Sequence, residues 1–475
     1  MRRPLVLVLL GALTGCALGP QHPTTTLPLA PPMSSFTIAP ASGPAQRLQS
    51  GAEAPADWWR QFGSPALDAL VARALAANND LATADAALRQ AREQARATSG
   101  TSLPQVDASY QAQRLRASRT LANPLPDPDI YLYSLHTAQL TVTYPLDLFG
   151  GQHSKVRSAR AAAEVAADKR DAARLTVIAN LVLAVVQQAS LHAQIDAVQD
   201  SIRSNRDVLA LLRTRQAIGD IGAADVASQE TALATAEAAL PPLQKQLDHQ
   251  NGLISALIGI APGSPLPPLP GFDALTLPAN LPLSLPSTVI ARRPDVRAAE
   301  AQMRGAGADV GTAIAARLPS FPLSATIGGQ ATQFADMFAS GNPFWSLIGG
   351  VTQPIFHGGA LLHQQRAAEA ALDGAKAQYR AAALQAFGDV SDALSGLRTD
   401  ADALDAATRA TVAADQNLRF TKRQLELGGV GTLALLNAAA ASAQAHGQQI
   451  QAKAVRFSDS VALIQAIGGS QATGE

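Results

Sequence analysis

Cys16 is the residue whose chemistry the sequence predicts most directly, because it is the single cysteine of the 475-residue chain. It directly follows Leu13-Thr14-Gly15, at the end of a short apolar run that begins after two arginines. A basic start, a short apolar run and small residues before a cleavage point are typical of a secretory signal peptide. We expect residues 1–15 to be removed and Cys16 to carry a covalent lipid. An ordinary signal peptide that contains a cysteine by chance is the alternative.

Other reactive side chains form no catalytic pattern. The eight histidines are scattered, with no His-Glu-x-x-His and no pair four residues apart, and no Gly-x-Ser-x-Gly motif occurs. Gly305, Gly307 and Gly311 miss the dinucleotide-binding spacing by one residue, so we interpret them as small residues that allow close helix approach. A lone cysteine excludes a disulfide framework and a multi-thiolate metal site. We therefore expect no enzyme, no metal and no cofactor besides the covalent lipid.

The composition favours closely packed helices and excludes one class of partner. Lys+Arg and Asp+Glu both number 37, so nothing in the net charge supports binding to nucleic acid through bulk positive charge. Hydrophobic residues make up 47% of the chain but aromatic residues only 4%, so the apolar content is mostly Ala, Leu and Val. Such a chain is suited to helices that pack along small side chains.

An internal repeat organises the chain. Gly219-x-x-Gly222 recurs as Gly428-x-x-Gly431, an offset of 209 residues, and Ala256-Leu257-Ile258-Gly259 has its counterpart at 465–468. Proline-rich stretches precede each copy and predict extended connections. The expected segments are a signal peptide (1–15), a lipid anchor and Pro-rich strap (16–57), a first repeat (58–260), a Pro-rich connector (261–286), a second repeat (287–469) and a tail (470–475).

Each repeat is expected to contain a helix, two strands, a very long helix, a tight glycine turn and a shorter helix. Residues 152–218 contain neither Gly nor Pro, and a helix of that length would be roughly 100 Å long. Its apolar residues recur three and four apart, which is coiled-coil spacing. The second long helix is expected from about 360 to 427. Pro241-Pro242 should kink or interrupt the helix that follows the first turn.

The strands are expected at about 103–115, 136–147, 318–331 and 344–356, and apolar and polar residues alternate along most of them. This pattern fits both an antiparallel sheet over a core and a membrane barrel. The export signal favours the barrel. Because four strands cannot close a barrel, the chain must then oligomerise. Two copies would give eight strands and three would give twelve, and only the larger barrel leaves an open lumen.

Several segments together resemble one family. Arg292-Arg293-Pro294-Asp295-Val296-Arg297-Ala298-Ala299-Glu300, running on to Leu318-Pro319-Ser320-Phe321, is similar to the hallmark segment of the TolC/OprM-type outer membrane factors, and Trp58-Trp59-Arg60-Gln61-Phe62-Gly63 resembles their N-terminal segment. With the lipid site, the resemblance is to the NodT-like lipoprotein branch. It implies an α+β, mainly α fold and a homotrimer with a 12-stranded transmembrane β-barrel on a long periplasmic α-helical barrel.

The same resemblance implies a function and partners. The chain would be the outer-membrane exit duct of a tripartite efflux pump that passively conducts small molecules or drugs. It would be anchored in outer-membrane lipid and dock to a periplasmic adaptor (membrane fusion) protein and an inner-membrane transporter of the resistance-nodulation-division (RND) class. Two alternatives stay open: the outer-membrane component of a type I (ABC-driven) secretion system, and a non-channel periplasmic coiled-coil lipoprotein scaffold.

Candidate site residues follow from this resemblance. In the family the pore narrows six or nine residues after each turn glycine, which here gives Asp225, Ser228, Ala434 and Asn437. Asp225 has an alternative role as a carboxylate that stabilises a helix start. The residues of the helix-turn tips are candidates for contact with the adaptor, and simple exposure to water is the alternative for the charged ones. They are Gly219, Gly222, Gly428, Gly431, Arg215, Asp220 and Glu426.

We interpret residues 292–300 as structural. Pro294 suits the first turn of a helix, and Asp295 suits its positive end. Arg297 and Glu300 are three residues apart, a spacing that predicts a helical ion pair.

Overall fold

The computed structural model describes residues 19–20, 23–27, 34–40, 44–52, 54–116, 132–283, 289 and 292–469. The predicted signal peptide, Cys16 and the tail 470–475 lie outside the described residues. The chain divides into two compact units. The sheet unit comprises Met1–Thr26, Ala87–Ala166 and Ala299–Tyr379, and the helix unit comprises Leu27–Ala86, Ala167–Ala298 and Arg380–Glu475.

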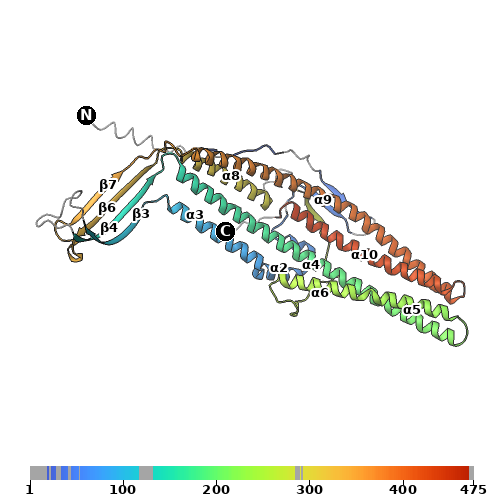
Figure 1. Cartoon of the computed structure of the whole chain (residues 1–475). Coiled ribbons are helices and arrows are strands. Elements are labelled where there is room, and N and C mark those ends of the chain that lie inside the picture. Colours follow the sequence, from blue (N-terminus) through green and yellow to red (C-terminus); the bar gives the residue numbers. More distant parts are fainter. Residues whose placement is uncertain are drawn as a thin grey trace. The chain divides into compact units, whose positions relative to one another are not determined.

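The sheet unit is built around four antiparallel strands in the order β3-β4-β6-β7 (Figure 1). Their bounds are β3 Gln105–Arg116, β4 Leu132–Leu146, β6 Phe321–Ala331 and β7 Pro343–Gly349. The hairpin of each repeat supplies two strands, and the β4–β6 ladder joins the two hairpins. The expected fourth strand, 344–356, was too long. Beyond Gly349 only an isolated bridge between Ser320 and Thr352 remains, because Gly349-Gly350 and then Pro354 weaken the ladder.

Alternation along the paired strands gives the sheet two chemically different faces. The apolar face collects large and small hydrophobic side chains: Val106, Ala108, Tyr110, Ala138, Leu140, Val142, Ala325, Ile327, Trp345 and Leu347. The opposite face is mostly polar on β3, β4 and β6, with the side chains of Asp107, Ser109, Gln111, Thr137, Gln139, Thr141, Thr143, Ser324, Thr326 and Gln330. We call it the polar face, although β7 adds the apolar Phe344 and Ile348 beside Ser346. Large apolar side chains such as Trp345, 78% exposed, are uncovered in the single chain. A sheet with an uncovered apolar face is suited to lipid on that side and water on the other.

The glycines of helix α8 (Pro294–Ala315) allow close packing within the sheet unit, as the sequence predicted. A side chain at Gly305 would lie 3.3 Å from Ala161 of the long helix α4 (Gly151–Ala217), and one at Gly307 would lie 3.0 Å from Pro23. Gly311 faces Gly19 so closely that a Cβ on Gly19 would lie 2.7 Å from the Gly311 Cα. Gly19 and Pro23, which follow the predicted lipid site in the chain, therefore pack against α8.

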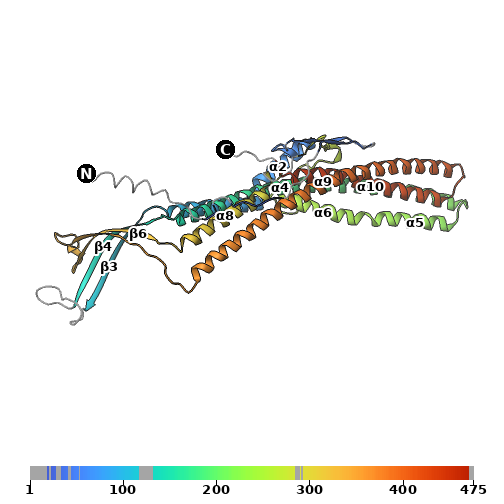
Figure 2. The same cartoon turned by 90° about the horizontal axis from the view of Figure 1, so that it is seen from above.

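The helix unit contains two long helical hairpins, which lie side by side in Figures 1 and 2. The first consists of α4 followed by α5 (Ala223–Ala238) and α6 (Leu240–Leu257), and the second of α9 (Ala360–Glu426) and α10 (Thr432–Ala466). The predicted interruption at Pro241-Pro242 is confirmed, because α5 ends and α6 begins on either side of Ala239. Both long helices were predicted to within a residue or two.

The backbone repeats with the same period as the sequence. Glycines with positive φ recur 209 residues apart before each long helix, at each turn and after each returning helix: Gly150 and Gly359 (70° and 83°), Gly219 and Gly428 (79° and 75°), Gly259 and Gly468 (71° and 87°). These conformations favour glycine because other residues lack easy access to positive φ. The duplication is therefore one of backbone geometry as well as sequence.

The apolar seam of α4 is the core of the helix unit. Leu181, Leu191 and Leu212 are at most 2% exposed, as the coiled-coil spacing predicted. In the described part of the chain, α4 alone has an apolar window long enough to cross a membrane, and 67% of that window is buried inside the fold. The apolarity of α4 is thus accounted for by helix packing.

A small sheet in the helix unit was not predicted. It has the order β1-β2-β5, with bounds Phe36–Ile38, Gln46–Ser50 and Asn280–Leu283. β2 pairs in parallel with β5, so the N-terminal strap and the Pro-rich connector, expected as separate extended segments, meet in one sheet. Helix α10 packs against this sheet, because it contacts β5 and its Ser460 accepts a hydrogen bond from the Gln46 side chain of β2 at 3.0 Å. The helix α2 (Pro65–Ala77) and the turn Trp58–Phe62 precede α3 (Asn79–Gly100).

Candidate functional site

The two hairpin tips have one backbone design. At the first tip the Asp220 amide donates to the Arg215 carbonyl (2.9 Å) and the Gly219 amide to the Gln216 carbonyl (3.0 Å). These two backbone hydrogen bonds around a glycine of positive φ form the Schellman motif that ends a helix. At the second tip the same bonds run from Gly429 to Gln424 (2.8 Å) and from Gly428 to Leu425 (3.1 Å).

The glycines that start the returning helices are also equivalent. Gly222 and Gly431 are extended N-cap residues, with φ, ψ of −82°, 162° and −83°, 168°. The Asp225 amide donates to the Gly222 carbonyl at 3.2 Å, and the Ala434 amide donates to the Gly431 carbonyl at 3.1 Å. The four tip glycines therefore fix two turns of matching geometry.

The predicted charged tip residues have local partners. Arg215 lies 3.8 Å from Asp220, with side chains 31% and 57% exposed. Glu426 pairs with Arg423 at 2.9 Å, and both are largely exposed. Ion pairs this exposed contribute little to stability. These side chains can therefore exchange the local ion pairs for contacts with another protein at little cost.

Sequence reasoning missed an apolar feature of both tips. Ile218 and Leu427, each directly before the turn glycine, are 76% and 70% exposed. Two turns earlier, Leu211 and Phe420 are 49% and 68% exposed. Both pairs are separated by 209 residues. Applying the repeat offset to every large apolar residue near the tips, and not only to the glycines, would have found them.

The four candidate constriction residues lie in the first two turns of α5 and α10. Asp225 and Ala434 occupy equivalent, half-buried positions, and Ser228 and Asn437 occupy equivalent, exposed positions one turn later. Asp225 is an acid in the first turn of α5, where the positive end of the helix dipole favours it. Its placement suits both of the roles considered from the sequence.

Polar contacts, buried in the first hairpin and half-buried in the second, hold each hairpin together near these residues. Gln229 is fully buried and donates to the Asn205 backbone carbonyl and side-chain oxygen, both at 2.9 Å. Asn205, a polar residue of α4, is thereby bonded to α5. In the second hairpin Ser442 donates to Asp415 (2.7 Å) and His446 lies 3.1 Å from the same carboxylate oxygen. Burial opposes ionisation of Asp415, but Ser442 and His446 outweigh it and lower its pKa.

The predicted structural role of residues 292–300 is supported by the bonds of Arg293. Its guanidinium donates to Asp295 at 3.0 and 2.7 Å, to Asp389 of α9 at 2.7 Å and to the Ala466 carbonyl of α10 at 3.1 Å. Burial disfavours both charges, but the ion pairs outweigh it, so the pKa of Arg293 is raised and that of Asp295 is lowered.

The predicted ion pair between Arg297 and Glu300 was wrong. Arg297 instead pairs with Asp168 of α4, whose side chain is 6% exposed. A pair between two helices replaces the pair within one helix because Asp168 is buried and needs a cation.

The polar face of the large sheet is suited to an aqueous pore wall. Between β4 and β6 the Thr141 and Thr326 hydroxyls lie 3.4 Å apart, and Gln330 donates to Thr137 at 3.4 Å. In the described part of the chain, no three His, Cys, Asp or Glu side chains gather as metal ligands would.

Comparison with known proteins agrees with this geometry. Residues 70–259 and 285–469 match the family described as outer membrane efflux protein. The chain belongs to this family. It is 31% identical to the pyoverdine export outer membrane protein OpmQ of Pseudomonas putida, covering 92% of this chain and 94% of that protein. It is 28% identical to the toluene efflux pump outer membrane protein TtgC of the same species, covering 96% and 93%.

Solved structures of outer-membrane channels have the same fold as this efflux protein. The outer-membrane channel OprN superposes with a TM-score of 0.86 at 26% identity, covering 96% of this chain and 99% of that one. The open state of the Neisseria gonorrhoeae MtrE outer membrane channel gives a TM-score of 0.83 at 25% identity, covering 96% and 98%. The expected fold class, the family and the function of an outer-membrane efflux channel are thereby confirmed. This efflux protein lies in the outer membrane and extends into the periplasm.

Proposed function

We propose that three copies of this chain form the exit duct of a tripartite efflux pump, with a periplasmic adaptor and an inner-membrane RND transporter as partners. The observation that carries the proposal is the two-faced sheet, in which the described edge strands β3 and β7 each pair on one side. Backbone groups in lipid must all be hydrogen-bonded, so these edges have to meet strands of other copies. Three copies supply twelve strands, with the apolar faces toward lipid and the polar faces around water.

Docking to the adaptor is proposed to use the two hairpin tips. Each tip combines a rigid glycine turn with an exposed apolar residue, Ile218 or Leu427, and with exposed charges. Exposed apolar side chains within a polar rim are typical of protein interfaces. The pore is proposed to narrow near Asp225, Ser228, Ala434 and Asn437, which follow these tips.

The lipid on Cys16 is a further part of the proposal. It is supported by the signal sequence, and Gly19 and Pro23, three and seven residues after Cys16, pack against α8. The segments predicted from the sequence, from the signal peptide 1–15 to the tail 470–475, are proposed as the organisation of the precursor.

Two measurements test the proposal. The protein purified in mild detergent should have the mass of a trimer and should produce ion conductance in liposomes. Expression with an RND transporter and its adaptor in cells that lack their own outer-membrane channel should restore drug resistance, and replacement of both Ile218 and Leu427 by Ser should abolish it without loss of the trimer. A monomer without conductance would refute the duct. Resistance restored only with an ABC transporter would favour type I secretion.

A further inference from the structure

The apolar face of the large sheet carries a hollow, and two arginines, Arg114 and Arg116, lie farther along the same face. We propose that this surface binds a phosphorylated, acylated lipid of the outer leaflet, with an acyl chain in the hollow and a phosphate on Arg114 and Arg116. The proposal rests on the membrane barrel of the proposed function but not on which pump the channel serves.

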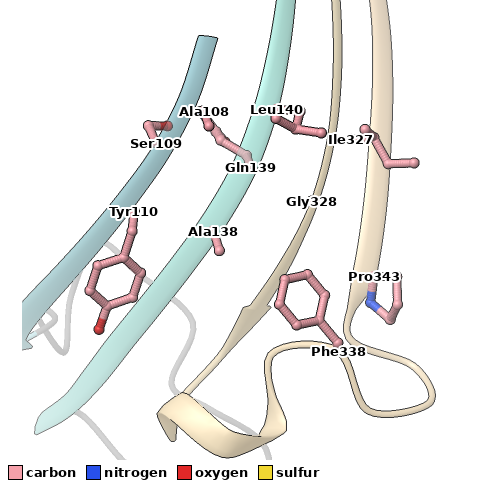
Figure 3. A pocket seen from close by; sticks show the side chains of 10 residues that line it. All are labelled: Ala108, Ser109, Tyr110, Ala138, Gln139, Leu140, Ile327, Gly328, Phe338 and Pro343. Carbon is pink, nitrogen blue, oxygen red and sulfur yellow. The ribbon is translucent and has the colours of Figure 1, made fainter.

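The hollow has the size and chemistry of a ligand site. Its volume is about 620 Å³, within the range of about 300–1,000 Å³ usual for small-molecule pockets. Small side chains, Ala108 and Ala138, form its floor, and larger ones rise around them (Figure 3). The larger lining residues include Tyr110, Ile327, Phe338 and Pro343.

One wall of the hollow comes from the segment between β6 and β7, which folds back over the apolar face. A Cβ at Gly329 would lie 2.1 Å from the Met337 carbonyl oxygen, so this approach requires glycine. Met337 is buried, and the Phe334 ring meets the Tyr110 ring edge-on with centroids 5.6 Å apart. Phe338, however, remains 69% exposed beside the hollow. The segment therefore shapes the hollow without filling it, and its exposed ring is available to an acyl chain.

The arginines lie on the same face, farther from the helices. Residues two apart on a strand share a face, so Arg114 and Arg116 follow Tyr110 on the apolar side. At about 3.3 Å per residue they lie roughly 13 and 20 Å beyond it. Strands β3 and β4 join α3 and α4 at the Gln105 and Leu146 ends, so the arginine end points outward, toward the outer leaflet.

The charge arrangement fits a phosphate. Arg114 donates to Ser134 on the neighbouring strand at 3.0 Å, which holds its guanidinium on this face. Both arginines are exposed. Within the described strands the acid, Asp107, lies on the opposite face, and the segment between β6 and β7 contributes one exposed acid, Asp336. Guanidinium groups bind phosphate oxygens through paired, charge-assisted hydrogen bonds. An acyl chain in the hollow thus places a phosphorylated headgroup within reach of both arginines.

Native mass spectrometry of the delipidated trimer tests the proposal with three probes: a phosphorylated lipid A, the same lipid dephosphorylated, and inorganic phosphate. We expect up to three phosphorylated lipids per trimer, held at least tenfold more tightly than the dephosphorylated form. Arg114→Ser with Arg116→Ser should abolish this preference, and Ala138→Leu, which fills the hollow, should reduce binding of both lipids.

Two matched controls separate specific from general effects. Ala325→Leu adds the same bulk to the same face outside the hollow, and Arg89→Ser with Arg92→Ser removes two exposed arginines from α3. Both controls should bind lipid as the unaltered trimer does. Equal binding of the two lipids by the unaltered protein, undiminished binding after Ala138→Leu, or equal loss in either control would overturn the proposal, as would binding of inorganic phosphate alone. A trimer that conducts ions but shows no lipid preference would refute the lipid site and leave the duct intact.

Discussion

Replacement of Arg293 by Met removes the cation that ties the start of α8 to α9 and to the end of α10. The Arg293 side chain is 11% exposed and donates four hydrogen bonds, two of them to Asp295 and one to Asp389. Methionine keeps much of the side-chain volume but none of these bonds. We therefore expect the loss of an electrostatic contact with little change in packing.

The magnitude follows from what the substitution leaves behind. Removal of one partner of a buried ion pair costs about 3–5 kcal/mol, because a buried charge is left uncompensated. Here the orphaned carboxylates of Asp295 and Asp389 are 47% and 34% exposed and can regain water, so we expect the lower end, about 3 kcal/mol. At about 2 °C per kcal/mol for a large folding unit, the apparent Tm should fall by about 6 °C.

Thermal unfolding of the detergent-purified protein, followed by circular dichroism, measures this change. Arg89→Met is the control, because Arg89 is an exposed arginine on α3 and its replacement alters the net charge equally. Addition of Asp389→Leu to Arg293→Met should restore part of the loss, since it removes one of the orphaned charges.

If Arg293→Met unfolds at the temperature of the Arg89→Met control, the four bonds add nothing to stability. The segment at 292–300 would then have a role other than the structural one that we assign to it.

Three further predictions concern other parts of the chain. Burial, with Asp400 nearby, raises the pKa of Asp459 to about 7. The stability that the neutral carboxyl contributes is complete below its unfolded pKa of 3.8 and is lost as the pH rises through 7. Asp459→Asn should therefore raise the apparent Tm at pH 8 and much less at pH 4.5; an equal effect at both would contradict the assignment. Gly428→Val should cost about 1–3 kcal/mol of local strain, because φ is 75° there, and hydrogen exchange of the residue 429 amide should become faster. Gly429→Ala is the control, since Gly429 has no positive φ. Similar exchange rates in both variants would argue against strain at Gly428. Cys16→Ser should leave a folded protein that is less enriched in the outer membrane, because each buried methylene of the anchor contributes about 0.8 kcal/mol; unchanged palmitate labelling would place the lipid elsewhere.

Local patterns in the sequence predicted the long helices and the turns that end them. A stretch without Gly or Pro, followed by a glycine turn, defined each long helix, because helix propagation and termination depend on residues within a few positions. The repeat offset identified both turns. The constriction candidates were located from the family spacing, and the structure puts them at equivalent positions, but which of them face a lumen depends on neighbouring copies.

Contacts between distant segments account for what the sequence analysis missed. Nothing local to Gln46–Ser50 marks its pairing with Asn280–Leu283, since parallel pairing is decided by a partner more than 200 residues away. The same reason explains Arg297, which has a plausible helical partner three residues away but pairs with Asp168, because that carboxylate is buried by packing that only the folded chain creates.

The sequence by itself determined the helices, the turns, the duplication and the two-faced strands, because each depends on residue types at short, regular spacing. The tertiary structure decided which face of each tip is apolar and exposed, how the β6–β7 segment folds over the sheet, and where Arg293 finds its acids. These features depend on burial and on carbonyl positions, which exist only when segments far apart in the chain are brought together.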